Sequence, residues 1–231
     1  IWDDFSQIVD NTRVHSIINF FTFFQGGTIN PGNTIDKLTG PYYKPLLSIF
    51  FSLLYSLFGQ NAFFFHLFQL TLHILNVIMI YFLFKYFFSK KSSLLLSILF
   101  LVHPINVEAV SYISALQEVL FFFFGILGLN LIIKYPGNSL KLYFAIFFLL
   151  LLSLLSKESG ILFVLILPTY LYIFRKKKIV PYALISALSV FSYLFLRIFF
   201  GNNHFSSEHI LPIQIAPLLL RLLNIPKIIL F

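Results

Sequence analysis

Long apolar stretches separated by short polar breaks make up most of the chain. Phe63–Phe88 and Leu140–Leu155 are two such stretches, and similar ones recur along the sequence. A membrane-spanning helix needs about 20 mostly apolar residues, whereas the strands of a membrane barrel alternate apolar and polar residues. The pattern therefore predicts an all-α fold, a polytopic bundle of transmembrane helices.

Three of the polar breaks are basic, and they contain Lys90–Lys91, then Lys134 with Lys141, then Arg175–Lys178. Because Lys and Arg beside membrane spans are retained on the cytoplasmic side, we expect all three breaks in the cytoplasm. The formal net charge of +8 is then a topology signal, and no nucleic-acid partner is expected.

Ser92–Ile133, between the first and second basic breaks, is long enough for a hairpin of two spans at about 20 residues each. In Ser92–Ile133 the outer turn is expected at His103–Glu108, and in Leu142–Phe174 it is expected at the polar interruption Ser156–Gly160. The span Ile179–Phe200 then returns to the outer side.

The N-terminal part is predicted to lie outside the membrane core. Phe63–Phe88 ends at basic residues and must run inwards, which leaves the preceding residues external. Lys44–Phe58 is apolar but spans only about 22 Å as a helix, too short for a hydrocarbon core of about 30 Å. Ser48, Ser52 and Ser56 give it one polar face, as expected for a helix in the interface.

We expect one membrane-embedded domain over 1–231, with an outer loop and interfacial helix at 1–59 and transmembrane helices at 60–231. A second outer loop is expected over 201–217, followed by an inward span. With 59% hydrophobic residues and a mean hydropathy of +0.92, the chain is no ordinary soluble domain. The absence of cysteine excludes disulfides and thiolate chemistry. The start without methionine and the end inside an apolar run suggest a fragment of a longer protein, with a C-terminal part missing.

All eight carboxylates map to the outer side or to the outer ends of predicted helices: Asp3, Asp4, Asp10, Asp36, Glu108, Glu118, Glu158 and Glu208. Acidic residues hardly affect orientation, so this asymmetry favours chemistry at the outer face. A transporter or lipid flippase, the alternative from another class, would place charges near mid-membrane. A structural anchor would need no clustered acids.

The adjacent Asp3 and Asp4 suit a site in which one carboxylate is a general base and the other tunes its pKa or holds a metal ion. Asp4 is thus a candidate ligand of a divalent cation. The alternative is a solvated turn with an N-cap aspartate.

The turn His103–Glu108 contains Pro104, which frees backbone groups for a polar ligand. The alternative is a capped hairpin turn, with Glu108 stabilised by a helix dipole. For Glu118, further into the next span, burial favours a functional role.

Lys157 and Glu158 suit a phosphate-binding lysine held by an acid, and a local ion pair is the alternative. Arg197 adds a second positive charge near the outer end of its span, or else extends to the headgroups. Together these residues suit an anionic lipid phosphate.

A polar stripe of His66, Gln69, His73 and Asn76 runs along one face of the first predicted span. Hydrogen bonds between helices are its commoner explanation. A metal site is less favoured, since the two histidines lie about 10 Å apart along the axis.

Six motifs, taken in order, resemble one family: Trp2-Asp3-Asp4 with Ile8-Val9-Asp10-Asn11; Tyr43-Lys44-Pro45-Leu46; His66 with Leu72-His73-Ile74-Leu75-Asn76; His103-Pro104 with Glu108-Ala109-Val110-Ser111-Tyr112-Ile113-Ser114; Ser156-Lys157-Glu158-Ser159-Gly160; and Arg197. In this order the chain resembles the multi-spanning C-type (GT-C) glycosyltransferases that use polyprenyl-phosphate sugars. The likeness is strongest to the transmembrane and tetratricopeptide-repeat protein O-mannosyltransferases and their bacterial relatives.

The resemblance implies a GT-C-type bundle that moves mannose or another hexose from a polyprenyl phosphate to an acceptor hydroxyl, with inversion at the sugar carbon. Asp3 or Asp4 would be the base. Lys157 and Arg197 would hold the donor phosphate, with Glu158 orienting Lys157. The residues implied in binding donor or acceptor are Lys44, His103, Glu108, Glu118, Lys157, Glu158 and Arg197.

The chain also departs from the family. Leu116 stands where many relatives have an arginine. The family's first span and any tetratricopeptide repeats are expected to lie outside this fragment. A protein Ser/Thr acceptor is expected, and a glycolipid or cell-wall polymer is the alternative. The active site is expected on the extracytoplasmic face of a multi-pass protein, in a bacterial inner or plasma membrane or in the endoplasmic reticulum of a eukaryote.

Overall fold

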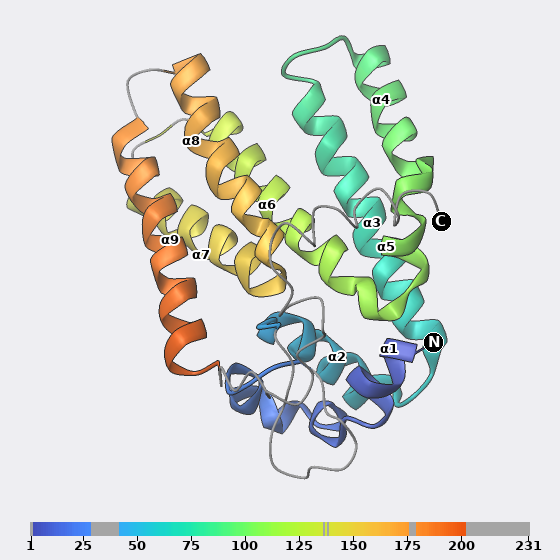
Figure 1. Ribbon diagram of the computed structural model, residues 1–231. Coiled ribbons are helices and arrows are strands. Elements are labelled where there is room, and N and C mark those ends of the chain that lie inside the picture. Colours follow the sequence, from blue (N-terminus) through green and yellow to red (C-terminus); the bar gives the residue numbers. More distant parts are fainter. Residues whose placement is uncertain (1, 29–41, 136, 138, 176–178, 202–231) are drawn as a thin grey trace, which may run out of the picture.

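The computed structural model describes residues 2–28, 42–135, 137, 139–175 and 179–201. Within these ranges every regular element is helical, so the predicted all-α bundle is confirmed. Long helices stand side by side, and a layer of short helices together with α2 closes one end (Figure 1). Asp36, Glu208, the loop predicted after residue 201 and the inward span from Leu218 lie outside the described residues.

The N-terminal layer comprises α1 (Trp2–Asp4), the π-helix η1 (Phe5–Val9), the 3-10 helices η2 (Thr12–His15) and η3 (Ile17–Phe24), and α2 (Pro45–Phe58). Proline at the first position starts α2, where its missing N–H costs nothing. Gly59 ends α2 with a φ of 61°, a conformation that favours glycine.

The serine face of α2 does not point where the sequence predicted. Ser48 and Ser52 are buried against the protein, because η2 and η3 cover α2 on one side and the bundle covers it on another. Ser56 is exposed and accepts a hydrogen bond from the Ile17 amide at 3.0 Å. Large apolar side chains such as Leu57 are exposed instead. The placement of α2 in the membrane interface stays a prediction.

The bundle comprises α3 (Ala62–Phe84), α4 (Lys90–Val102), η4 (Pro104–Asn106), α5 (Val107–Ser111), η5 (Ile113–Ala115), α6 (Leu116–Lys134), α7 (Leu140–Ser156), η6 (Glu158–Gly160), α8 (Ile161–Arg175) and α9 (Ile179–Phe199). Among the described helices, three are long and apolar enough to cross a membrane: α3, Ile113–Lys134 and α9. Lys90–Val102 and Pro104–Ser111, bent by 47°, make a fourth if they count as one span. The predicted turns at 103–108 and 156–160 are confirmed as breaks between helices.

The helix α6 lies at the centre and packs against α3 on one side and α7 on the other. One apolar cluster joins α6 to α7, α8 and α9 around residues such as Leu150. A second cluster joins the N-terminal layer to α3 and to the start of α6, around Phe51 and Leu120. The second cluster fixes the N-terminal layer against the end of the bundle where α6 begins.

Gly160, the last residue of η6, allows the turn after α7 to lie against the α7 backbone. A Cβ at this position would lie 2.7 Å from the carbonyl carbon of Ser153 and 2.8 Å from the amide of Leu154. Both are backbone atoms, which cannot move aside as a flexible side chain could.

Gly160→Ala is therefore expected to destabilise the protein by about 1–3 kcal/mol, the usual cost of overpacking, and to displace Lys157 and Glu158. Thermal unfolding of the full-length protein in detergent measures this. Gly128→Ala is the matched control, because its Cβ would meet only a side-chain atom at an ordinary 3.7 Å. Equal unfolding temperatures for the two variants would contradict the close approach.

Candidate functional site

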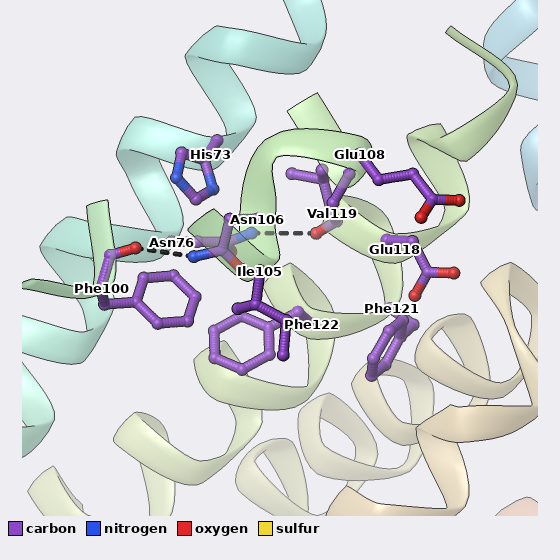
Figure 2. Close-up of a pocket in the computed structure, with 11 residues that line it drawn as sticks. His73, Asn76, Phe100, Ile105, Asn106, Glu108, Glu118, Val119, Phe121 and Phe122 are labelled. Carbon is purple, nitrogen blue, oxygen red and sulfur yellow. Dashed lines mark hydrogen bonds between the residues drawn. The ribbon is translucent and has the colours of Figure 1, made fainter. Parts of the chain in front are cut away.

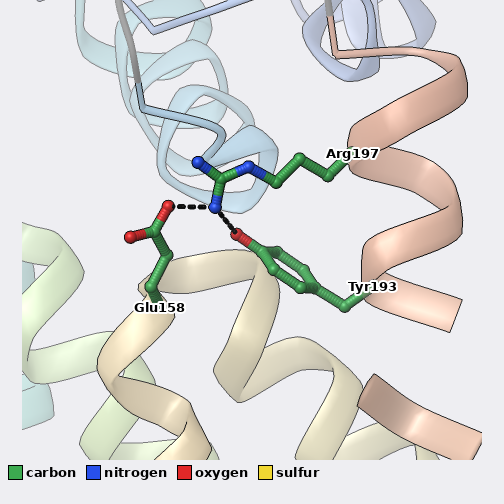
Figure 3. A network of polar contacts seen from close by, with 3 residues as sticks. All are labelled: Glu158, Tyr193 and Arg197. Carbon is green, nitrogen blue, oxygen red and sulfur yellow. Dashed lines mark hydrogen bonds and ion pairs between the residues drawn. The ribbon is translucent and has the colours of Figure 1, made fainter. Parts of the chain in front are cut away.

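Two ion pairs lie at the end of the bundle that faces the N-terminal layer. Lys157 pairs with Glu118, which is in the first turn of α6. Arg197, in the last turn of α9, donates from Nη1 to Glu158 Oε1 at 2.5 Å and to Tyr193 Oη at 3.3 Å (Figure 3). The helices α6 and α9, the 3-10 helix η6 and the residue that links α7 to η6 thus contribute charges to one region.

The expected pairing of Lys157 with its neighbour Glu158 is wrong. Lys157 has an extended backbone, with φ −158° and ψ 144°, and successive side chains of extended backbone point in opposite directions. Lys157 therefore contacts α6 while Glu158 contacts α9. The partner that orients Lys157 is Glu118.

The two ion pairs are only partly shielded from water. The side chains of Lys157 and Glu118 are 28% and 31% exposed, and those of Arg197 and Glu158 are 32% and 45% exposed. Ion pairs at such exposure stabilise a fold by at most about 1 kcal/mol. Both cations can therefore exchange their carboxylate for another anion at low cost.

Lys44 is a third cation at this end, and it is almost completely buried, with 9% of its surface exposed. Its ammonium lies 4.3 Å from the ring centroid of Tyr42. Within the described part of the chain its side chain makes no hydrogen bond or ion pair.

The pKa of Lys44 is lowered from its ordinary value, first by desolvation and then by the positive charge of Lys157. The charges of Glu118, Glu158 and Asp3 oppose this shift. These four charged groups act on one amine, so Lys44 belongs to the same region as both ion pairs.

The two N-terminal aspartates differ in their contacts. Asp4 is half-buried, and its Oδ1 accepts a hydrogen bond from the Ser114 amide at 2.9 Å, which ties α1 to the turn before α6. Asp3 is exposed, and Ser6 donates to its main-chain oxygen at 3.2 Å. No group of three or more His, Asp or Glu side chains that could hold a metal ion occurs in the described ranges.

A pocket of about 270 Å³ adjoins this charged region (Figure 2). Its lining comes from α3, the α4–α6 connection and α6, and consists of His73, Asn76, Phe100, Ile105, Asn106, Glu108, Ala109, Glu118, Val119, Phe121 and Phe122. Glu118 belongs both to this lining and to the ion pair with Lys157.

His103 does not line the pocket. It is exposed, and its Nδ1 accepts a hydrogen bond from the Ile105 amide at 3.2 Å, which caps η4. The interpretation of this turn as a capped hairpin connection therefore holds at His103, while Glu108 faces the pocket.

Known proteins match much of this chain. It is 31% identical over 167 residues to the human protein named Protein O-mannosyl-transferase TMTC3, a match that covers 70% of this chain and 18% of that protein. It is 30% identical over 172 residues to Protein O-mannosyl-transferase F38B6.6 of Caenorhabditis elegans, covering 70% and 23%. Over most of its length the chain is similar to these protein O-mannosyl-transferases.

These matches confirm the resemblance found in the motifs. The chain spans about a fifth of the length of the O-mannosyl-transferases it matches. No family model matches it, and no solved structure matches it.

Three residues of the polar stripe on α3 form hydrogen bonds between helices. The amide of Gln69 donates to the carbonyls of Ala109 at 2.5 Å and Tyr112 at 2.7 Å. The amide of Asn76 donates to the Val119 carbonyl at 3.0 Å, and His73 Nε2 lies 3.3 Å from the Leu101 carbonyl oxygen. His66 is exposed.

Sequence reasoning missed that His73 and Asn76 also line the pocket. The signal was present, because these two residues lie on the polar stripe. Their placement opposite Glu108 and Glu118 depends on the bend between α4 and α5, which the sequence does not reveal.

Proposed function

We propose that this chain is the membrane-embedded part of a glycosyltransferase. It moves a hexose, mannose by analogy with the names of its relatives, from a polyprenyl phosphate to a Ser or Thr hydroxyl of a protein. The observation that carries the proposal is the gathering of Asp3, Lys44, Lys157 and Arg197 at one end of the bundle. A base and several cations are what transfer from a lipid phosphate requires.

Asp3 is the base in this proposal. Its carboxylate is exposed and makes no hydrogen bond within the described residues, so it is available to a hydroxyl group. Asp4 holds Ser114 instead and positions its neighbour. If a divalent cation takes part, Asp4 is the residue that would bind it.

In the reaction, Asp3 removes the proton from the acceptor hydroxyl, and that oxygen attacks the anomeric carbon. The bond from this carbon to the phosphate oxygen breaks, and its electron pair leaves with the polyprenyl phosphate. Attack opposite the leaving group inverts the configuration. The protein need only position the partners, accept one proton and neutralise the charge that develops on the phosphate.

Lys44, Lys157 and Arg197 bind that phosphate. Glu118 and Glu158 hold two of these cations in place before the donor arrives. Since both pairs are partly exposed, the phosphate can join or replace the carboxylates as partner. Lys44 brings a positive charge that no carboxylate among the described residues neutralises by direct contact.

The outer face is the proposed location of the site. Lys90 and Lys91 begin α4 and Lys134 ends α6, and these helix ends lie opposite the N-terminal layer (Figure 1). Because basic residues stay in the cytoplasm, the end with the ion pairs faces the other side.

Reconstitution of the full-length protein tests the function. With radiolabelled polyprenyl-phosphate mannose and a Ser/Thr-containing peptide, label is expected on the peptide and should be released by alkaline β-elimination. Label found only on a glycolipid would reject the protein acceptor. Absence of label from every acceptor would reject the proposed transfer.

A further inference from the structure

We infer that the pocket between α3, α5 and α6 holds the pyranose ring of the donor, with Glu118 at the boundary between the sugar and its phosphate. This inference rests on the proposed function and assigns one part of that site. It gives a binding role to His73, Asn76 and Asn106, in addition to Glu108 and Glu118.

The polar lining of the pocket offers mainly hydrogen-bond acceptors. Asn76 is 2% exposed, and its amide nitrogen is occupied by the Val119 carbonyl at 3.0 Å. Carbonyls only accept, so the amide orientation follows from this bond. Asn76 Oδ1 is buried without a hydrogen-bond partner among the described residues. Such an unpaired buried acceptor favours a ligand that supplies a hydrogen-bond donor at this wall of the pocket.

The other polar groups of the pocket are fixed in the same way. The amide of Asn106 donates to the Phe100 carbonyl at 2.6 Å, which leaves Oδ1 as its acceptor. His73 Nε2 faces the Leu101 carbonyl at 3.3 Å, so Nε2 carries the proton and Nδ1 accepts. Together with the carboxylates of Glu108 and Glu118, these groups favour a ligand with many hydrogen-bond donors. The hydroxyl groups of a sugar are such donors.

The remaining walls are aromatic. Phe100 stacks on Phe122 with ring centroids 5.4 Å apart, and His73 stacks on Phe100 at 5.7 Å. A pyranose presents a C–H face as well as hydroxyl groups, and such apolar walls with a few placed polar groups are typical of small-molecule sites. The volume of about 270 Å³ is just below the range of about 300–1,000 Å³ that is usual for pockets of drug-sized ligands, which suits a single sugar ring.

A phosphate does not fit this pocket, because no Lys or Arg is among its lining residues. Glu118 links the pocket to a cation, because its carboxylate pairs with Lys157. A sugar in the pocket would therefore carry its phosphate toward Lys157, in the region of Lys44 and Arg197.

Binding of two lipids to the full-length protein tests the inference, with polyprenyl phosphate and polyprenyl-phosphate mannose as probes. Ala109→Leu fills the pocket without removing a polar group, and Asn76→Ala removes the unpaired acceptor. Each variant should bind the mannose-bearing lipid at least 10-fold more weakly relative to wild type and bind polyprenyl phosphate within twofold of wild type. His66→Ala, on the same helix but exposed, should change neither affinity.

Unchanged affinity of both pocket variants for the mannose-bearing lipid would overturn the inference, as would equal losses for both lipids. Retained binding of polyprenyl phosphate shows that a variant is folded. Failure of the proposed function looks different, because the wild-type protein would then bind neither lipid.

Discussion

Asp3→Asn is expected to lower the rate constant for sugar transfer by about 10²–10⁴-fold, the usual contribution of a general base. Asparagine keeps the size of the side chain but cannot take the proton. Asp3 is exposed and its side chain is unbonded within the described residues, so the unfolding temperature should not change. Transfer of radiolabelled mannose from polyprenyl phosphate to a peptide measures the rate.

Two control substitutions make this result specific. Asp10→Asn changes another exposed acid of the same loop and should leave the rate unchanged. Asp4→Asn keeps an oxygen that can accept from the Ser114 amide and should cost less than Asp3→Asn. A normal rate in Asp3→Asn with a large loss in Asp4→Asn would move the base to Asp4, and normal rates in both would remove the acids from catalysis.

The second large effect is expected at the pair of Arg197 and Glu158. Arg197→Gln should reduce transfer by about 10²–10³-fold, as removal of one group that stabilises developing charge does. The reduction should appear with the mannose-bearing donor and also as weaker binding of polyprenyl phosphate alone.

Exchange of the two charges separates phosphate binding from a structural role. In Glu158→Arg/Arg197→Glu the ion pair can form again, so the unfolding temperature should recover. Sugar transfer should not recover, because the guanidinium would then be attached to η6 instead of α9. A wild-type rate in the exchanged protein would mean that the pair only holds η6 against α9.

The helices could be predicted because their signals are local. Runs of about 20 apolar residues end at basic residues or at proline and polar breaks, and the predicted span Ile179–Phe200 matches α9, Ile179–Phe199, almost to the residue. The placement of Asp3, Glu118 and Glu158 at one end was expected from the same alternation of spans.

The predictions that were wrong concern side chains whose neighbours come from distant segments of the sequence. The serines of α2 are buried because η2 and η3 cover them, and the sequence gives no signal of that cover. Lys157 and Glu158 bind different helices because the backbone between them is extended. The unpaired Oδ1 of Asn76 could not be predicted, because it depends on the hydrogen bond from the Asn76 amide nitrogen to the Val119 carbonyl.

The central claim is that one site at the outer face transfers a sugar from a lipid phosphate. The most direct measurement uses sealed membrane vesicles of known orientation that contain the full-length protein and radiolabelled polyprenyl-phosphate mannose, with a membrane-impermeant Ser/Thr peptide added only to the outside. Right-side-out vesicles are predicted to label the peptide and inside-out vesicles are not, and Asp3→Asn should slow the labelling by about 10²–10⁴-fold. Labelling confined to inside-out vesicles, or unaffected by Asp3→Asn, would contradict the account.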